Sequence, residues 1–177
     1  SVKQPCSLNR LSNLIKATGT PCSPSTVMEY VRYLQESCLL ISIDNYVSKF
    51  VEKETIKKHY FVDNGLLHLF INNPNTSLLE NLCAITLYKK YAKGLYYYNR
   101  NIEVDFYVPD EGIAVQASYQ MSDGETIERE VKALVALHGL HPLKRAMIIT
   151  YEDEGEIVRD GLRIEIKPAW KWVLEGL

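Results

Sequence analysis

The fold of this chain depends on one stretch, Ile102-Glu103-Val104-Asp105-Phe106-Tyr107-Val108. Apolar and polar residues alternate along it, which is typical of a β-strand with one buried face. The next residues, Pro109-Asp110-Glu111-Gly112, have the chemistry of a tight turn. The chain then continues through a second strand-like run, Ile113 to Ser118. The sequence therefore predicts a β-hairpin closed by the loop Pro109–Gly112.

The length of this loop fixes the expected pairing of the two strands. It places Val108 opposite Ile113, so that Asp105 faces Gln116 and Glu103 faces Ser118. Directly opposed side chains lie about 5 Å apart at Cβ. We therefore expect one polar face and one apolar face, made respectively of Glu103, Asp105, Gln116 and Ser118 and of Val104, Phe106, Val115 and Ala117. A carboxylate pair beside two polar groups is equally typical of a site and of a solvated sheet face.

Predicted elements on both sides of the hairpin give the order helix, three strands, helix, strand and a short tail. We expect Ser77 to cap a helix that ends near Ala92 and Gly94. An aromatic strand follows, in which Tyr96, Tyr97 and Tyr98 pack in the sheet rather than stack on bases. The remaining elements are a helix that begins at Ser122 or Asp123 and ends near Gly139, and a buried strand from Arg145 to Thr150.

The first half of the chain has the element order of a winged helix-turn-helix. Ser7 caps a predicted helix that ends at Gly19, and Ser25 begins a second one that ends at Glu36. Two predicted strands, Leu39 to Ile43 and His59 to Val62, flank a lysine-containing stretch that would form the wing. The helix that usually precedes these elements is missing. The chain also begins without methionine, so we expect a fragment or a processed chain.

A DNA-binding winged helix places its second helix in the major groove and its wing on the backbone. The candidate nucleic-acid contacts here are Arg32, Lys49, Lys53 and Lys57. Acidic residues in the same segments offset these charges, which suits phosphates poorly: Glu29, Glu36, Glu52 and Glu54. This balance favours a protein-interaction role over direct reading of DNA.

Composition limits the remaining function classes. The 177 residues are 46% hydrophobic and 24% charged, which is typical of a globular chain with one large domain or two small ones. The net charge of −2 gives no whole-chain electrostatic case for nucleic acid. No apolar run is long enough to span a membrane and no signal peptide opens the chain, so we expect a cytoplasmic protein without a membrane partner. Its cysteines, without metal-ligand spacing, are expected to be reduced and mostly buried: Cys6, Cys22, Cys38 and Cys83.

The hairpin and its preceding helix resemble the PD-(D/E)xK nuclease pattern. Glu80 in the helix, Asp105 in the second strand and Gln116 in the third match its motif positions, and Ser118 stands where the motif has lysine. In active relatives the acidic residues hold Mg²⁺ and the lysine helps to activate water. The resemblance thus implies Asp105 and Glu80 as metal ligands, with Mg²⁺ as a cofactor only if the site is active. Without the lysine, and with a neutral Gln116, the implied site is degenerate.

Two residues of this pattern have competing interpretations. The stretch Ser77-Leu78-Leu79-Glu80 is an S-x-x-E capping box, so Glu80 is a candidate for capping its own helix as well as for binding metal. Lys132, on the following helix, is a candidate substitute for the missing lysine or an ordinary exposed helix residue.

Over nearly all of its length the chain resembles the C-terminal region of a large family of prokaryotic AAA-type ATPases. The matching stretches are Tyr60–Leu66, Leu79–Leu82, Glu103–Phe106, Ile148–Tyr151 and Ile166–Leu174. The resemblance implies an α/β (α+β) fold, with a winged-helix-like domain over 1–73 and a restriction-endonuclease-like αβββαβ domain over 74–177.

The same resemblance sets the functional expectation. It implies a non-catalytic C-terminal module that engages a partner or nucleic acid, behind an ATPase domain in the same polypeptide, with DNA binding and homo-oligomers as open alternatives. No Walker motif occurs in this chain, so ATP chemistry is not assigned to it. The rival readings are a metal-dependent DNA nuclease and a winged-helix transcription regulator.

Overall fold

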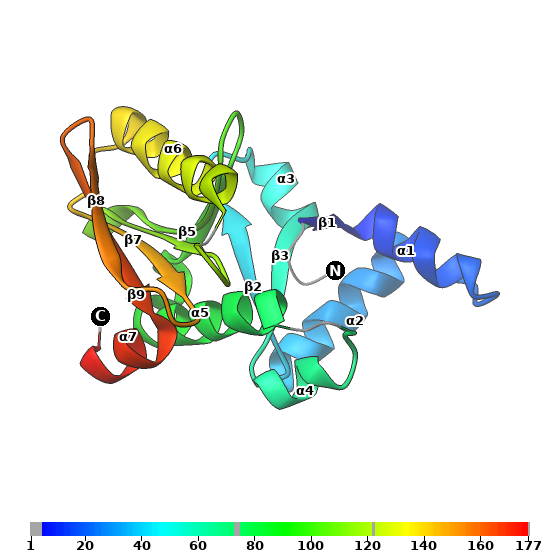
Figure 1. The fold of residues 1–177 in the computed structure, drawn as a ribbon. Coiled ribbons are helices and arrows are strands. Elements are labelled where there is room, and N and C mark those ends of the chain that lie inside the picture. The colour runs from blue at the N-terminus through cyan, green and yellow to red at the C-terminus, as the bar shows by residue number, and fades with distance from the viewer. Residues whose placement is uncertain (1–4, 73–74, 122, 177) are drawn as a thin grey trace.

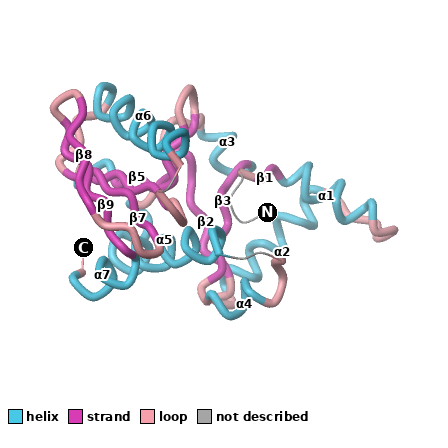
Figure 2. Tube along the Cα trace, viewed as in Figure 1, coloured by secondary structure: helices cyan, strands magenta, loops and turns pink. Residues whose placement is uncertain are grey.

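The computed structural model of the chain describes residues 5–72, 75–121 and 123–176. It is a mixed α/β structure, and its described strands form one mixed sheet in the order β1-β3-β2-β4-β5-β6-β7-β9-β8 (Figures 1 and 2). The strands are β1 (Cys6–Ser7), β2 (Leu40–Asn45), β3 (Ile56–Phe61), β4 (Tyr96–Asn99), β5 (Glu103–Val108), β6 (Ile113–Ala117), β7 (Arg145–Thr150), β8 (Gly155–Arg159) and β9 (Leu162–Pro168).

Helices cover both faces of this sheet. They are α1 (Leu8–Ala17), α2 (Pro24–Glu36), α3 (Phe50–Thr55), α4 (Asn64–His68), α5 (Asn75–Tyr91), α6 (Gly124–Leu140) and α7 (Ala169–Glu175), with short 3₁₀ turns at Ala92–Gly94 and Pro109–Glu111. In Figure 1, α5 and α7 lie on one face and α6 on the other. Two apolar clusters follow from this: one buries Leu87 and Trp172 beneath α5 and α7, the other Leu134 beneath α6. No described helix is both long and apolar enough to cross a membrane.

The first half matches most of the expected elements. Ser7 caps α1 by accepting from the Arg10 amide, and Gly19 follows the helix with φ +87°. The predicted start of the second helix at Ser25 is wrong, because Ser23 is the cap and Pro24 the first helical residue. The two strands that flank the expected wing, β2 and β3, pair antiparallel, and the lysine-containing stretch between them contains the short helix α3.

In the second half, Asp123 caps α6 as expected, accepting from the Glu125 and Thr126 amides; the alternative cap, Ser122, lies outside the described residues. The predicted cap at Ser77 is wrong, because α5 begins at Asn75 and Ser77 lies inside it. The expected short tail is wrong as well. It holds the β8–β9 hairpin and α7.

The expected hairpin register is confirmed, since Val108 pairs with Ile113 and Phe106 with Val115. The expected division into faces is wrong. Phe106 packs in the cluster beneath α5, whereas Val104 packs in the cluster beneath α6. The cause is a register shift against β4, which pairs Tyr96 with Tyr107 but Tyr98 with Val104. Two residues of β5 therefore oppose the single Tyr97, as in a β-bulge, and the alternation of side chains is broken there.

The expected domain division falls between α4 and α5, at residues 73–74, which lie outside the described part of the chain. Strands from the two sides join directly, because β2 pairs in parallel with β4. The Asn45 side chain strengthens this junction: its amide donates to the Asn99 carbonyl at 2.7 Å and accepts from the Asn99 N–H at 3.0 Å. The two segments thus share one continuous sheet.

Candidate functional site

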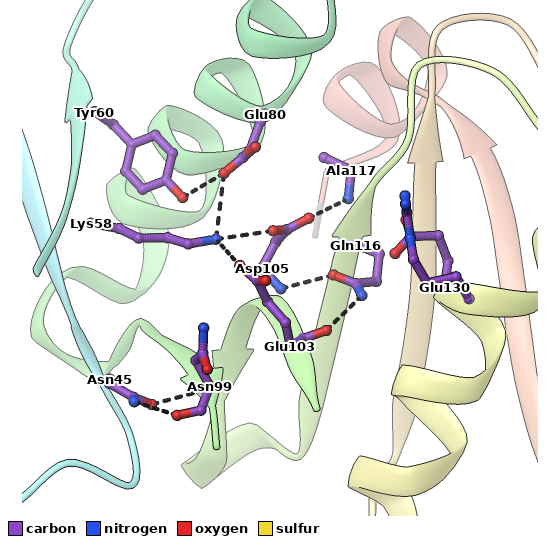
Figure 3. Close-up of polar contacts among 11 residues, drawn as sticks. Asn45, Lys58, Tyr60, Glu80, Asn99, Glu103, Asp105, Gln116, Ala117 and Glu130 are labelled. Carbon is purple, nitrogen blue, oxygen red and sulfur yellow. Dashed lines mark hydrogen bonds and ion pairs between the residues drawn. The ribbon is translucent and has the colours of Figure 1, made fainter. Parts of the chain in front are cut away.

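The candidate site is organised around a lysine that the hairpin does not supply. Lys58 extends from β3 toward α5 and β5, and its side chain is fully buried. Its Nζ lies 3.1 Å from Asp105, 3.3 Å from Glu103 and 3.7 Å from Glu80 (Figure 3). The ring centroid of Tyr97 lies 5.6 Å from the same nitrogen. The site thus gathers one cation and the carboxylates of one helix and one strand.

The electrostatics of this cluster follow from its burial. Desolvation alone would lower the pKa of Lys58, but the nearby carboxylates of Asp105, Glu80 and Glu103 outweigh it and raise the pKa above its ordinary value. Lys58 is therefore an ammonium at any physiological pH. Tyr60 donates to Glu80 at 2.9 Å, and burial together with that carboxylate raises the pKa of Tyr60 well above the usual value. Tyr60 is thus a neutral hydrogen-bond donor.

Asp105 and Gln116 are brought together, but their polar atoms are bound to the sheet. The Asp105 N–H donates to Gln116 Oε1 at 2.8 Å, and Gln116 Nε2 donates to the Glu103 carbonyl at 3.1 Å. Asp105 Oδ2 accepts from the Ala117 N–H at 3.1 Å, while Oδ1 accepts from Lys58. These bonds replace the strand ladder beyond the last regular pair, Phe106 and Val115.

The cluster opens on one side into a cleft of about 1140 Å³ between the hairpin and α6. Ser118, in the position of the motif lysine, lines this cleft but is buried and donates to the Gln120 carbonyl at 3.2 Å. On the opposite wall, Glu130 is buried and pairs with Arg129. Burial raises the pKa of Glu130, against the opposing effect of Arg129. The cleft therefore combines carboxylates with a few basic groups.

The remaining candidates have other contacts. Glu80 lies within α5, where its carboxylate accepts from Tyr60 and pairs with Lys58. The predicted capping box with Ser77 is therefore wrong. Lys132 lines the cleft, but its ammonium is largely exposed and lies 3.4 Å from Glu128 on the same helix. The structure thus brings Asp105 and Glu80 to one cation and leaves Lys132 at the rim.

Three of the four candidate nucleic-acid contacts, Arg32, Lys53 and Lys57, lie beside a carboxylate or an aromatic ring. Arg32 lies 3.4 Å from Glu36, and Lys57 lies 2.8 Å from Asp44. Lys53 lies over the ring of Tyr96, 5.4 Å from its centroid. Lys49 is exposed at the N-cap of α3, and its backbone N–H donates to Glu52 at 3.2 Å. These pairings offset the charges of Arg32, Lys53 and Lys57.

Two residues of the candidate site were missed from the sequence, Lys58 and Glu130. Lys58 belongs to the lysine-containing stretch that was expected to form the wing, although strand alternation places it on the same face as the buried Tyr60. That shared phase is the signal that could have found it. Glu130 carries no comparable signal, because a lone glutamate in a helix is normally exposed.

Two of the stretches that carry the family resemblance contact one another. The Asn81 side chain accepts from the Phe61 N–H and donates to the Phe61 carbonyl, both at 2.9 Å. It also donates to Asn64 Oδ1 at 2.8 Å, and Asn64 donates to the Leu78 carbonyl at 3.0 Å. The segments Tyr60–Leu66 and Leu79–Leu82 therefore attach α5 to β3 beside the lysine cluster.

Comparison with known proteins gives one informative similarity. The chain is 31% identical to an uncharacterized protein of Methanocaldococcus jannaschii over an alignment of 183 residues. The alignment covers 95% of this chain but 40% of the archaeal protein, so the chain spans less than half of that relative's length. No family model matches the chain, and the search of solved structures gave no significant match.

Proposed function

We propose that this chain is a non-catalytic C-terminal module of an AAA-type ATPase, which engages a partner or nucleic acid through a degenerate nuclease-like domain. In this proposal 1–73 form a winged-helix-like domain and 74–177 a restriction-endonuclease-like one. The ATPase domain would lie upstream in the same, cytoplasmic polypeptide. The greater length of the archaeal relative is consistent with such a further domain.

One observation carries the non-catalytic part of the proposal: the motif residues are used to hold the sheet together. Both ends of the Gln116 amide are bonded to β5 backbone, and Asp105 Oδ2 is bonded to β6 backbone. A metal-dependent nuclease needs carboxylate oxygens free to bind Mg²⁺ and a cation that activates water. Ser118 offers neither, because its hydroxyl is buried and bonded to a carbonyl.

A metal-titrated cleavage assay tests this proposal. The full-length protein is incubated with single-stranded, duplex and branched DNA over a range of Mg²⁺ and Mn²⁺ concentrations. We expect no cutting above the level of an Asp105→Ala variant. Cutting that requires the metal and is lost in Asp105→Ala would refute the non-catalytic role.

The rival function is a metal-dependent nuclease whose lysine comes from another strand. The contact that favours it is the 3.1 Å distance between Lys58 Nζ and Asp105 Oδ1. This reading predicts that Lys58→Arg reduces cutting strongly while Lys132→Ala leaves it nearly unchanged. If Lys132→Ala were the variant that abolished cutting, the relocated lysine would lie on α6 instead.

A further inference from the structure

The divalent metal that the nuclease resemblance implies does not fit the residues present. Asp105 Oδ1 accepts from Lys58 and Oδ2 from the Ala117 N–H, while Glu80 Oε1 receives Tyr60 and faces Lys58. The Lys58 Nζ lies 3.1 and 3.7 Å from their oxygens, so the ammonium occupies the space between the two carboxylates that a Mg²⁺ ion would need. Among the described residues, no group of three His, Cys, Asp or Glu side chains is arranged to hold a metal ion.

An internal cation already lies between the implied metal ligands. We propose that the Lys58 ammonium is the permanent cation of this site and takes the place of the divalent metal between Asp105 and Glu80. This assignment rests on the contacts of Lys58 and goes beyond the proposed module role. It would hold even if the module role were wrong.

The charge balance explains why a cation is needed there. Glu80 and Asp105 are largely shielded from water, and Glu103 is 45% exposed. Carboxylates this close cannot all stay ionised in a low dielectric without a positive charge among them. Lys58 supplies that charge from β3: its ammonium donates to Asp105 and lies within ion-pair distance of Glu80 and Glu103. Because the lysine is covalently part of the sheet, the site needs no metal to hold its shape.

The contacts of Lys58 also distinguish a counter-ion from a lysine that activates water. A lysine that activates water beside a metal must share the water with that metal. Here Nζ lies among the carboxylates themselves, with the Tyr97 ring 5.6 Å away. The geometry therefore matches a counter-ion better than a partner of a bound metal.

Metal-dependent thermal stability tests the assignment. The full-length protein, its Lys58→Ala variant and a Lys57→Ala control are melted with and without MnCl₂ or MgCl₂. Lys57 is the matched control because it neighbours Lys58 on β3 and pairs with the single carboxylate of Asp44. We expect Lys58→Ala to lower the Tm by about 6–20 °C, as for a broken buried ion pair. Mn²⁺ at about 100 times its Kd should recover about 5–10 °C in that variant. The Tm of the wild type and of Lys57→Ala should not change when MnCl₂ or MgCl₂ is added.

Each result decides the question. A folded Lys58→Ala that ignores divalent metals would overturn the assignment, as would a wild type in which Mn²⁺ broadens the Ala117 amide resonance, beside Asp105. If Lys58→Ala does not fold with or without metal, Lys58→Met/Glu103→Gln removes one acidic partner and keeps Asp105 and Glu80. A metal-induced rise in its Tm supports the assignment and its absence refutes it. DNA cleavage is scored separately, so failure of the module proposal remains distinguishable.

Discussion

Asp105 and Gln116 hold the open end of the β5–β6 pair together, each through a side chain bonded to the backbone of the other strand. The Asp105 N–H donates to Gln116 Oε1 at 2.8 Å, and Asp105 Oδ2 accepts from the Ala117 N–H at 3.1 Å. Gln116 is buried, so its amide replaces ladder bonds that the diverging strands do not make. In this chain the two motif positions therefore have a structural use.

Restoring the acidic residue of the nuclease motif should consequently weaken the protein. In Gln116→Glu the donor to the Glu103 carbonyl is lost, and a further carboxylate is placed near Asp105 and Glu103. We expect the free energy of unfolding to fall by about 1–3 kcal/mol, as for a buried polar group left without its partner. Chemical denaturation measures this change.

The same substitution at Gln120 provides the control, since that side chain is exposed in the segment after β6 and lines the same cleft. Gln120→Glu should change stability by no more than about 0.5 kcal/mol. Equal losses in both variants would show that added charge, rather than the lost amide contacts, is the cause.

Two amide side chains, those of Asn45 and Asn81, join the two halves of the chain. Asn45 bonds the backbone of Asn99, and Asn81 bonds the backbone of Phe61, each by donating and accepting at once. A carboxamide has one donor group and one acceptor group, like a peptide bond. It can therefore hydrogen-bond to the backbone of a neighbouring segment where no second backbone is in reach.

Asn81→Ala should therefore destabilise the junction between α5 and β3. It leaves the Phe61 N–H and carbonyl without their partner and opens space at a fully buried position. We expect a loss of about 2–4 kcal/mol in the free energy of unfolding. Asn13→Ala, at an exposed position of α1, serves as the control. A cost below that of a typical surface substitution would mean that Asn81 does not hold the junction.

The register of the central hairpin could be predicted because it depends on local features alone. Loop length and the phase of the alternation fix which residues pair, and Val108 pairs with Ile113 as expected. The strand β9 could have been found in the same way, since Leu162, Ile164 and Ile166 alternate with polar residues, although only a short tail was expected there. The face on which Val104 lies could not be predicted. The bulge arises from the pairing of β5 with β4, and the local sequence of β5 carries no sign of it.

Lys58 shows why the centre of the site was harder to predict than its fold. A lysine is almost never fully buried unless it is paired, and its partners here are 22 to 47 residues away in sequence. The acidic residues Glu80 and Asp105 could be found from motif spacing. Their shared cation could not, because it reaches them only after β2 joins β4 and brings β3 alongside α5.

The basic residues of the first half lead to a prediction about duplex DNA. Because Lys57 pairs with Asp44 and Arg32 with Glu36, we expect only weak, non-specific binding at physiological salt, with a Kd of about 10⁻⁴–10⁻⁶ M. Fluorescence anisotropy at several salt concentrations measures this affinity. Tighter, salt-sensitive binding that weakens in a Lys49→Ala, Lys53→Ala and Lys57→Ala triple variant would instead support the winged-helix regulator.

The pH dependence of stability should reveal His59, on the opposite face of β3 from Lys58. Its Nδ1 lies 2.7 Å from Ser42 Oγ, and burial together with the charge of Lys57 lowers the pKa of His59 to about 4. In the unfolded chain histidine titrates near 6.5. Between these values the folded state binds fewer protons than the unfolded state, so stability is lost as the pH falls from about 6.5 to about 4.

We expect this window to contribute on the order of 1–3 kcal/mol to the loss of unfolding free energy. Urea denaturation of the wild type and of His59→Gln at several pH values between about 4 and 7 isolates the contribution, because the carboxylates titrate in both proteins. The difference in stability between the two should shrink steadily toward low pH. His68→Gln, at an exposed position of α4, should retain the wild-type slope. A His59→Gln variant that loses stability as steeply as the wild type would show that His59 is protonated in the folded state, in a site more open to water than its contact with Ser42 implies.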